Sequence, residues 1–244
     1  MAGKALFISM LGEAEHYEPK DFTNLCPSGY ERDWVLEWHG ASAASAGLTL
    51  EGTDICRGEA LPDPKAFDGV VLGGTMHVVT EDREWLHRLR DWLKTYRAGG
   101  KPLLAICGGH QMLSTQFGEG TLTGRDAGTL AGTYPVSLTD AGRSHPLFTG
   151  MSESPKFHFA NYLHVIPSPA QNSGVLAVQN GSPAIALDHG GGWFSTQFHP
   201  EARKASWDRY YSLQDAEFQS AYEPEHDGAA LIENFFKYSA THGS

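Results

Sequence analysis

The distribution of apolar residues predicts alternating strands and helices in the first half of the chain. Short apolar runs at 4–10, 70–72 and 103–106 are typical of buried strands. Between the last two, residues 84–97 carry large apolar side chains at intervals of three and four, which indicates a helix with one buried face. The same patterns predict a helix over 30–46, a strand over 48–56 and a closing helix over 229–239. This order favours an α/β fold with a mostly parallel central sheet flanked by helices on both faces.

After residue 120 the pattern changes to short segments rich in glycine and threonine. It predicts a strand over 132–138, a hairpin of strands 174–178 and 183–187, and a strand with period-two alternation over 193–198. We therefore expect the second half to extend the sheet in antiparallel fashion.

Two irregular segments interrupt these patterns, within what we expect to be one domain spanning residues 1–244. Residues 11–29 follow the first strand, and residues 203–227 are polar but carry several aromatic side chains. Both are expected to be insertions. A long loop at a strand end can also carry function, and the aromatic residues of 203–227 can pack as a helical excursion, cover a site or dock a partner.

Composition narrows the possible partners and compartments. The 244 residues carry a formal net charge of −11 and no cluster of lysine and arginine, so a nucleic-acid partner is not expected. Three cysteines without regular spacing do not form a disulfide framework, which fits a reducing cytoplasm. The apolar run near the N-terminus is short for a signal peptide, and no run has membrane-spanning length, so no membrane association is expected.

The strand 103–106 leads directly into Cys107, Gly108 and Gly109, followed by a helix-like pattern. A reactive side chain at such a sharp strand-to-helix turn needs small neighbours, as in a nucleophile elbow. The following helix favours the thiolate, and the N–H of Gly108 is placed to face an oxyanion. The alternative is a buried cysteine that only packs in a glycine-rich turn.

Two further strand ends carry candidate chemistry. The strand 193–198 ends in His199, Pro200 and Glu201, which suits a general base and its orienting carboxylate, although a surface turn has the same pattern. The strand 70–72 ends in Gly73 and Gly74, which allow close backbone approach to a ligand or form a simple turn.

Together these stretches resemble the class I glutamine amidotransferases. The family's Gly-x-Cys-x-Gly-His-Gln elbow is matched over 105–111, departing at Ala105, and its Gln-Phe-His-Pro-Glu strand end is matched at 197–201. Residues 68–74 match the family's Asp-Gly, apolar strand, Gly-Gly segment. The chain is similar to stand-alone members that resemble the glutaminase domain of GMP synthetase, which implies a flavodoxin-like fold.

The resemblance implies a Cys-His-Glu triad that acts through a γ-glutamyl thioester. Cys107 is then the nucleophile that attacks a γ-carboxamide, His199 moves the proton, and Glu201 holds the imidazole. The N–H groups of Gly74 and Gly108 form the implied oxyanion hole.

The residues implied to contact substrate are Gly73, Gln111 and Met76. Family members usually have a proline-containing turn where this chain has 75–77, so recognition beside the substrate is expected to differ. No cofactor and no metal are expected. His158 and His164 form a weak alternative metal pair because no third ligand is evident.

Three functions stay open from the sequence. The first is a glutaminase-type hydrolase that acts alone or supplies ammonia to a separate synthetase subunit. The second is a hydrolase of another γ-glutamyl amide or peptide. The third is a non-catalytic relative that binds a metabolite or a partner. The oligomeric state is not predicted.

Overall fold

A computed structural model describes residues 2–118 and 120–243; residues 1 and 244, the ends of the predicted 1–244 domain, and residue 119 lie outside it. The strands are β1 (Gly3–Ser9), β2 (Leu48–Asp54), β3 (Gly69–Leu72), β4 (Leu103–Ile106), β5 (Thr121–Gly124), β6 (Leu130–Pro135), β7 (Ser137–Leu138), β8 (Lys156–Asn161), β9 (Leu163–Ile166), β10 (Val175–Gln179), β11 (Ser182–Asp188) and β12 (Trp193–Thr196). The α-helices are α1 (Glu31–Ser45), α2 (Glu84–Ala98), α3 (Gly108–Met112), α4 (Asp140–Arg143), α5 (Lys204–Leu213) and α6 (Gly228–His242).

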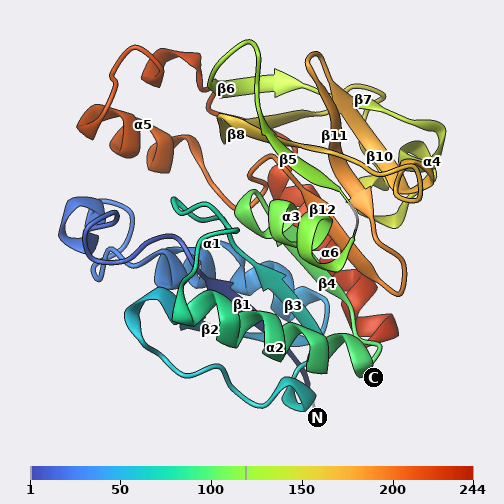
Figure 1. Cartoon of the computed structure of the whole chain (residues 1–244). Helices are drawn as coiled ribbons and strands as arrows, with labels where there is room; N and C mark the ends of the chain where they lie inside the picture. Colours follow the sequence, from blue (N-terminus) through green and yellow to red (C-terminus); the bar gives the residue numbers. More distant parts are fainter. Residues whose placement is uncertain (1, 119, 244) are drawn as a thin grey trace.

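The main sheet has the strand order β2-β1-β3-β4-β12-β11-β10-β7 (Figure 1). The strands from β2 to β12 pair in parallel, and β11, β10 and β7 continue the sheet in antiparallel fashion. This confirms the predicted mostly parallel sheet with an antiparallel extension. The carboxyl ends of β1, β3, β4 and β12 therefore meet at one edge, where open α/β sheets bind their ligands.

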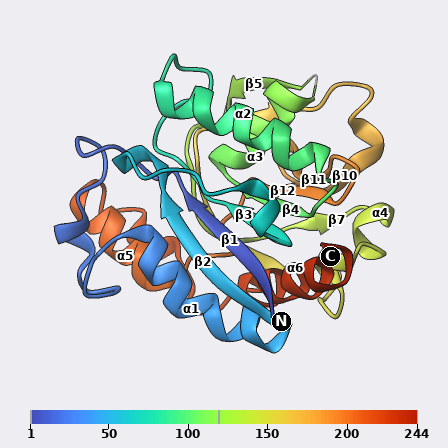
Figure 2. The same cartoon turned by 90° about the horizontal axis from the view of Figure 1, so that it is seen from below.

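Helices cover both faces of the sheet, as Figure 2 shows with α1 and α6 on one side and α2 and α3 on the other. Along β4, Leu104 and Ile106 join the core packed against α1 and α6, whereas Leu103 and Ala105 join the core packed against α2 and α3. Successive side chains of a strand point to opposite faces, so each strand contributes to two apolar cores. Two covered faces explain why these strands are continuous apolar runs.

Several predicted strands differ in the structure. The predicted strand 132–138 divides at Pro135 into β6, which pairs with β8, and β7, which lies at the edge of the main sheet. Proline lacks the N–H that a continuous ladder needs. The ribbons β5–β9 and β6–β8 lie outside the main sheet, so the antiparallel extension is smaller than predicted.

The strand predicted over 193–198 ends at Thr196, is buried at every position, and pairs in parallel with β4 rather than within the antiparallel part alone. The alternation of apolar and polar residues in this strand therefore does not mark a face exposed to solvent. The predicted strand 48–56 ends at Asp54, where a 3-10 turn begins. The helix after Cys107 also changes character, because α3 continues as a π-helix over Leu113–Phe117.

Candidate active site

The sharp strand-to-helix turn predicted at Cys107 is present at the end of β4. Cys107 has φ 51°, and it is the one non-glycine residue with positive φ in the described ranges 2–118 and 120–243. Such a backbone conformation is costly for a residue with a side chain and occurs mainly at functional sites. A Cβ at Gly109 would lie 3.1 Å from Ala105 Cβ and 3.2 Å from the carbonyl oxygen of Gly73, so the small neighbours are required by packing.

The elbow is tied directly to the neighbouring strand. The backbone N–H of Cys107 donates to the carbonyl of Thr196, the last residue of β12, at 2.7 Å. Three residues later, the N–H of His199 donates to the carbonyl of His158 in β8 at 2.8 Å. The first bond therefore ties the cysteine to β12, and the second ties the histidine to β8.

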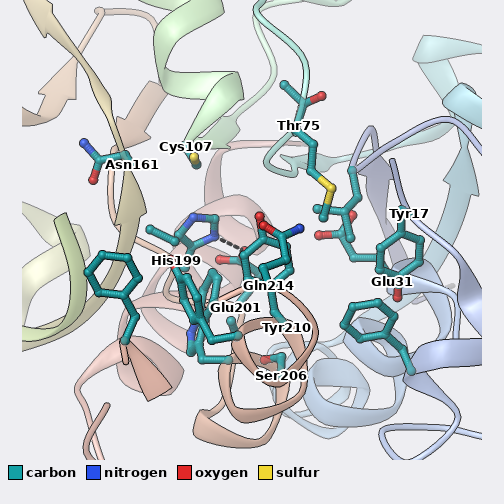
Figure 3. A pocket seen from close by; sticks show the side chains of 18 of the residues that line it. Tyr17, Glu31, Thr75, Cys107, Asn161, His199, Glu201, Ser206, Tyr210 and Gln214 are labelled. Atoms are coloured by element: carbon teal, nitrogen blue, oxygen red, sulfur yellow. Dashed lines mark hydrogen bonds and ion pairs between the residues drawn. The ribbon is translucent and has the colours of Figure 1, made fainter. Parts of the chain in front are cut away.

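His199 and Glu201 form a buried pair. Nδ1 of His199 lies 2.8 Å from Oε1 of Glu201, and both side chains are almost fully buried. Among the described residues, Nε2 of His199 has no hydrogen-bond partner, and Figure 3 shows this edge of the ring turned toward Cys107. Burial opposes the charged imidazole, but the Glu201 carboxylate and the Cys107 sulfur outweigh it and raise the pKa of His199 well above its ordinary value.

Two other histidines hold this pair in place. Nε2 of His39 in α1 donates to the carbonyl of Glu201 at 2.9 Å. The ring of His158 stacks on His226 with centroids 3.8 Å apart, and its Nδ1 lies 2.9 Å from Thr133 Oγ1. Burial lowers the pKa values of His39 and His158, that of His158 to about 2, so both are neutral supports.

Gly74 and Gly108 lie beside Cys107. A Cβ at Gly74 would lie 3.1 Å from Cε1 of His199 and 3.3 Å from Cβ of Cys107. A Cβ at Gly108 would lie 3.0 Å from the backbone nitrogen of Thr75. The two backbone segments are thus in close contact at the point where an oxyanion hole is predicted.

The three predicted substrate contacts lie at different depths. Gln111 and Met76 line the cavity, and Gln111 Nε2 donates to Oε1 of Gln197 at 3.2 Å. Gly73 is not part of the cavity lining, because its N–H donates to the carbonyl of Ile8 at 2.9 Å and the residue is buried below the surface.

Cys107, His199 and Glu201 open into a cavity of about 380 Å³. Both irregular segments of the sequence form its walls. From the first come Leu11, Tyr17, Phe22 and Leu25, and from the second come Ser206, Trp207, Tyr210, Tyr211, Gln214, Asp215 and Phe218. The segments touch each other through an ion pair between Arg209 and Asp21 at 3.6 Å. Residues 204–213 form the helix α5, and its aromatic side chains pack and line the cavity at once.

One lining residue had no signal in the sequence. Glu31, the first residue of α1, is 2% exposed and is one of the residues that line the cavity. Ser9 Oγ, at the end of β1, donates to its Oε2 at 2.7 Å. Burial raises the pKa of Glu31 to about 8, and the nearby Glu201 carboxylate adds to that shift. An isolated glutamate at a predicted helix start looks like an ordinary dipole-stabilising residue, so only the fold reveals its place.

Within residues 2–118 and 120–243, no three His, Cys, Asp or Glu side chains are arranged to hold a metal ion. His164 instead lies 3.3 Å from Ser182 Oγ through its Nδ1. The three cysteines are free thiols. No helix in the described ranges is both long enough and apolar enough to cross a membrane.

Solved structures with the same fold span nearly the whole chain. A glutamine amidotransferase from Thermotoga maritima superposes with a TM-score of 0.73 at 16% identity, covering 98% of this chain and 99% of its own. A putative GMP synthase subunit from Thermoplasma acidophilum gives 0.64 at 16% identity, covering 99% and 96%. At identities this low, the superpositions show that the fold is shared and nothing finer.

Similarity in sequence points to the same family. The chain is 28% identical over 179 residues to the imidazole glycerol phosphate synthase subunit HisH of Natronomonas pharaonis, covering 65% of this chain and 81% of the relative. It is 34% identical over 152 residues to the glutamine-hydrolyzing GMP synthase of Aeropyrum pernix, covering 62% of this chain but only 27% of that relative.

The family profile described as glutamine amidotransferase class-I matches residues 48–215, which is more than half of the chain and includes Cys107, His199 and Glu201. With the fold shared across its full length and the elbow at the end of β4, the chain belongs to the class I glutamine amidotransferase family.

Proposed function

We propose that this protein is a cysteine-dependent hydrolase of the γ-carboxamide of glutamine or of a related γ-glutamyl amide. The observation that carries the proposal is the arrangement around Cys107. A strained elbow presents the sulfur to a histidine whose far nitrogen is bound by a buried glutamate at 2.8 Å. This is the relation of nucleophile, base and orienting group that acyl transfer requires.

The reaction proceeds in two balanced steps. The Cys107 thiolate attacks the amide carbon, and the oxyanion that forms is stabilised by the N–H groups of Gly74 and Gly108. His199 donates its proton to the amide nitrogen, the C–N bond breaks, and ammonia or an amine leaves. Water, deprotonated by His199, then attacks the γ-glutamyl thioester, and the C–S bond breaks to release glutamate and restore the thiolate. Glu201 stabilises the imidazolium throughout.

One possible protein partner and one class of substrate fit this activity. Relatives named as subunits, such as HisH of Natronomonas pharaonis or the GMP synthase subunit of Sulfolobus acidocaldarius, favour a separate synthetase that uses the ammonia. The size of the cavity favours an amide with a larger amine portion, because its walls continue past Cys107 to Tyr17 and Trp34. Free ammonia as leaving group does not require that space.

The test is glutamate release from L-glutamine and from a panel of γ-glutamyl amides by the wild-type protein, Cys107→Ala and Cys56→Ala. Cys56 is a second free thiol that lies outside the cavity, so its variant controls for loss of any cysteine. We expect release that depends on Cys107 and not on Cys56. Activity that survives Cys107→Ala contradicts the mechanism.

A further inference from the structure

The cavity contains a second polar centre that the hydrolytic mechanism does not use. Figure 3 shows Glu31 and Tyr17 on one side of Cys107 and His199, and Asn161 on the other side. On the side with Glu31, Phe22 stacks on Tyr17 with ring centroids 4.5 Å apart, and Trp34, one turn after Glu31 in α1, also lines the cavity. The Glu31 carboxyl is therefore an ionisable group in a mostly apolar arm of the cavity.

The fold places Glu31 close to the reaction centre. Its Oε2 lies 3.4 Å from the position of a Cβ on Gly73, and Cβ of Cys107 lies 3.3 Å from the position of a Cβ on Gly74. The carboxyl and the nucleophile thus flank two adjacent residues of one turn. Glu31 also lies between the ends of β1 and β3, where the strand order reverses and ligands of such sheets bind.

The carboxyl has no lysine or arginine partner. Among the described residues, no lysine or arginine lies within ion-pair distance of Glu31, and its one hydrogen-bond donor there is Ser9. Two nearby carboxylates, Glu201 and Asp54, disfavour its charge, and His199 favours it. Without a cation beside it, the buried carboxyl keeps its proton at neutral pH, because burial disfavours the charged form. A ligand that brings a positive charge supplies the missing partner.

We propose that Glu31 determines substrate specificity by binding a primary ammonium group on the amine portion of a γ-glutamyl amide. This inference rests on the proposed function, because it assigns the arm to the leaving group of that reaction. The glutamyl half then lies on the side of Gln111 and Asn161, and the methylene spacer of the amine contacts the walls made by Tyr17 and Met76. L-Glutamine leaves this arm without a charged occupant.

The test compares two γ-glutamyl amides of equal length, one ending in an ammonium group and the other in a methyl group, over a series of spacer lengths. Above pH 8, where Glu31 has released its proton, we expect the wild-type protein to prefer the ammonium compound in kcat/KM by about tenfold or more, the usual strength of a charge-assisted hydrogen bond. Glu31→Gln should remove most of this preference. Glu37→Gln, an exposed change on the same helix, should leave it intact.

Three results overturn the inference. One is a wild-type protein that hydrolyses the methyl compound as fast as the ammonium compound at every spacer length, a result that does not depend on whether the variant folds. Another is a preference that survives Glu31→Gln. The third is an equal loss for both amides and L-glutamine, which places Glu31 on the shared glutamyl half.

A binding measurement separates this inference from the proposed function. Calorimetry on Cys107→Ala, with and without Glu31→Gln, measures the affinity for both amides without turnover. Tighter binding of the ammonium compound that depends on Glu31 supports the ammonium site even if no amide is hydrolysed. Equal affinities contradict it even if hydrolysis by Cys107 is established.

Discussion

Replacing Glu31 with glutamine should change how stability depends on pH. The pKa of this carboxyl is about 8 in the folded protein and 4.5 in the unfolded chain. Below the unfolded value, both states carry the proton and Glu31 contributes no pH dependence. As pH rises above that value, the unfolded chain releases its proton while the folded protein keeps it, so Glu31 lowers the free energy of unfolding progressively until its folded-state pKa is passed.

The magnitude follows from the two pKa values. Each unit of difference is worth about 1.4 kcal/mol, so the destabilisation by Glu31 grows by about 2.5 kcal/mol between pH 5 and pH 7. A glutamine at this position has no proton to release and keeps an oxygen that accepts from Ser9 Oγ. The variant should therefore gain stability relative to the wild-type protein by about that amount as pH rises over this range.

The assay is urea unfolding of the wild-type protein and Glu31→Gln at several values across this pH range, with the two free energies subtracted at each pH. Subtraction cancels the contributions of the other titrating groups, apart from their coupling to Glu31. Glu37→Gln serves as the control for removing an exposed carboxylate from the same helix. A constant difference for Glu31→Gln would refute the reasoning, because it means that the folded protein keeps this carboxyl at an ordinary pKa.

Three further substitutions test the candidate site. Gly74→Ala adds a Cβ 3.1 Å from Cε1 of His199 and 3.3 Å from Cβ of Cys107, so it should lower kcat about tenfold to a hundredfold with unchanged circular dichroism; an unaffected kcat means that this turn lies away from the reacting atoms. In the proposed mechanism Glu201 stabilises the imidazolium, so Glu201→Gln should lower kcat by about a hundredfold or more in steady-state assays, whereas full activity excludes the orienting role. Trp207→Ala removes a buried ring that packs edge-on against His199 with ring centroids 4.8 Å apart, so it should lower the free energy of unfolding measured in urea by about 3 kcal/mol. An unchanged free energy of unfolding means that this ring does not contribute to the core.

Two irregular segments interrupt the regular alternation of strands and helices, and both form walls of the cavity. Residues 11–29 extend from the end of β1 and residues 203–227 follow the end of β12, so both begin at the edge of the sheet where Cys107 lies. Each brings aromatic side chains over the same cavity. These segments therefore form much of the cavity wall, together with residues 75–77 and 160–163.

Local sequence was sufficient for the parts of the protein that depend on neighbouring residues. The apolar runs predicted β1, β3 and β4, and the three-four spacing predicted α2 within one residue of its observed end. The glycines around Cys107 predicted the strained elbow, because only small residues allow that turn. The chemistry of a cysteine, a histidine and a carboxylate at strand ends could be recognised for the same reason.

Only the tertiary structure decided the features that depend on residues far apart in the chain. The parallel pairing of β12 with β4, and the separation of β6 from β7, follow from which strands meet and not from their own sequences. The pKa of Glu31 likewise depends on burial beneath segments far along the chain and on the carboxylate of Glu201. Burial and electrostatic interactions depend on which residues are close in space, so the local sequence pattern does not predict them.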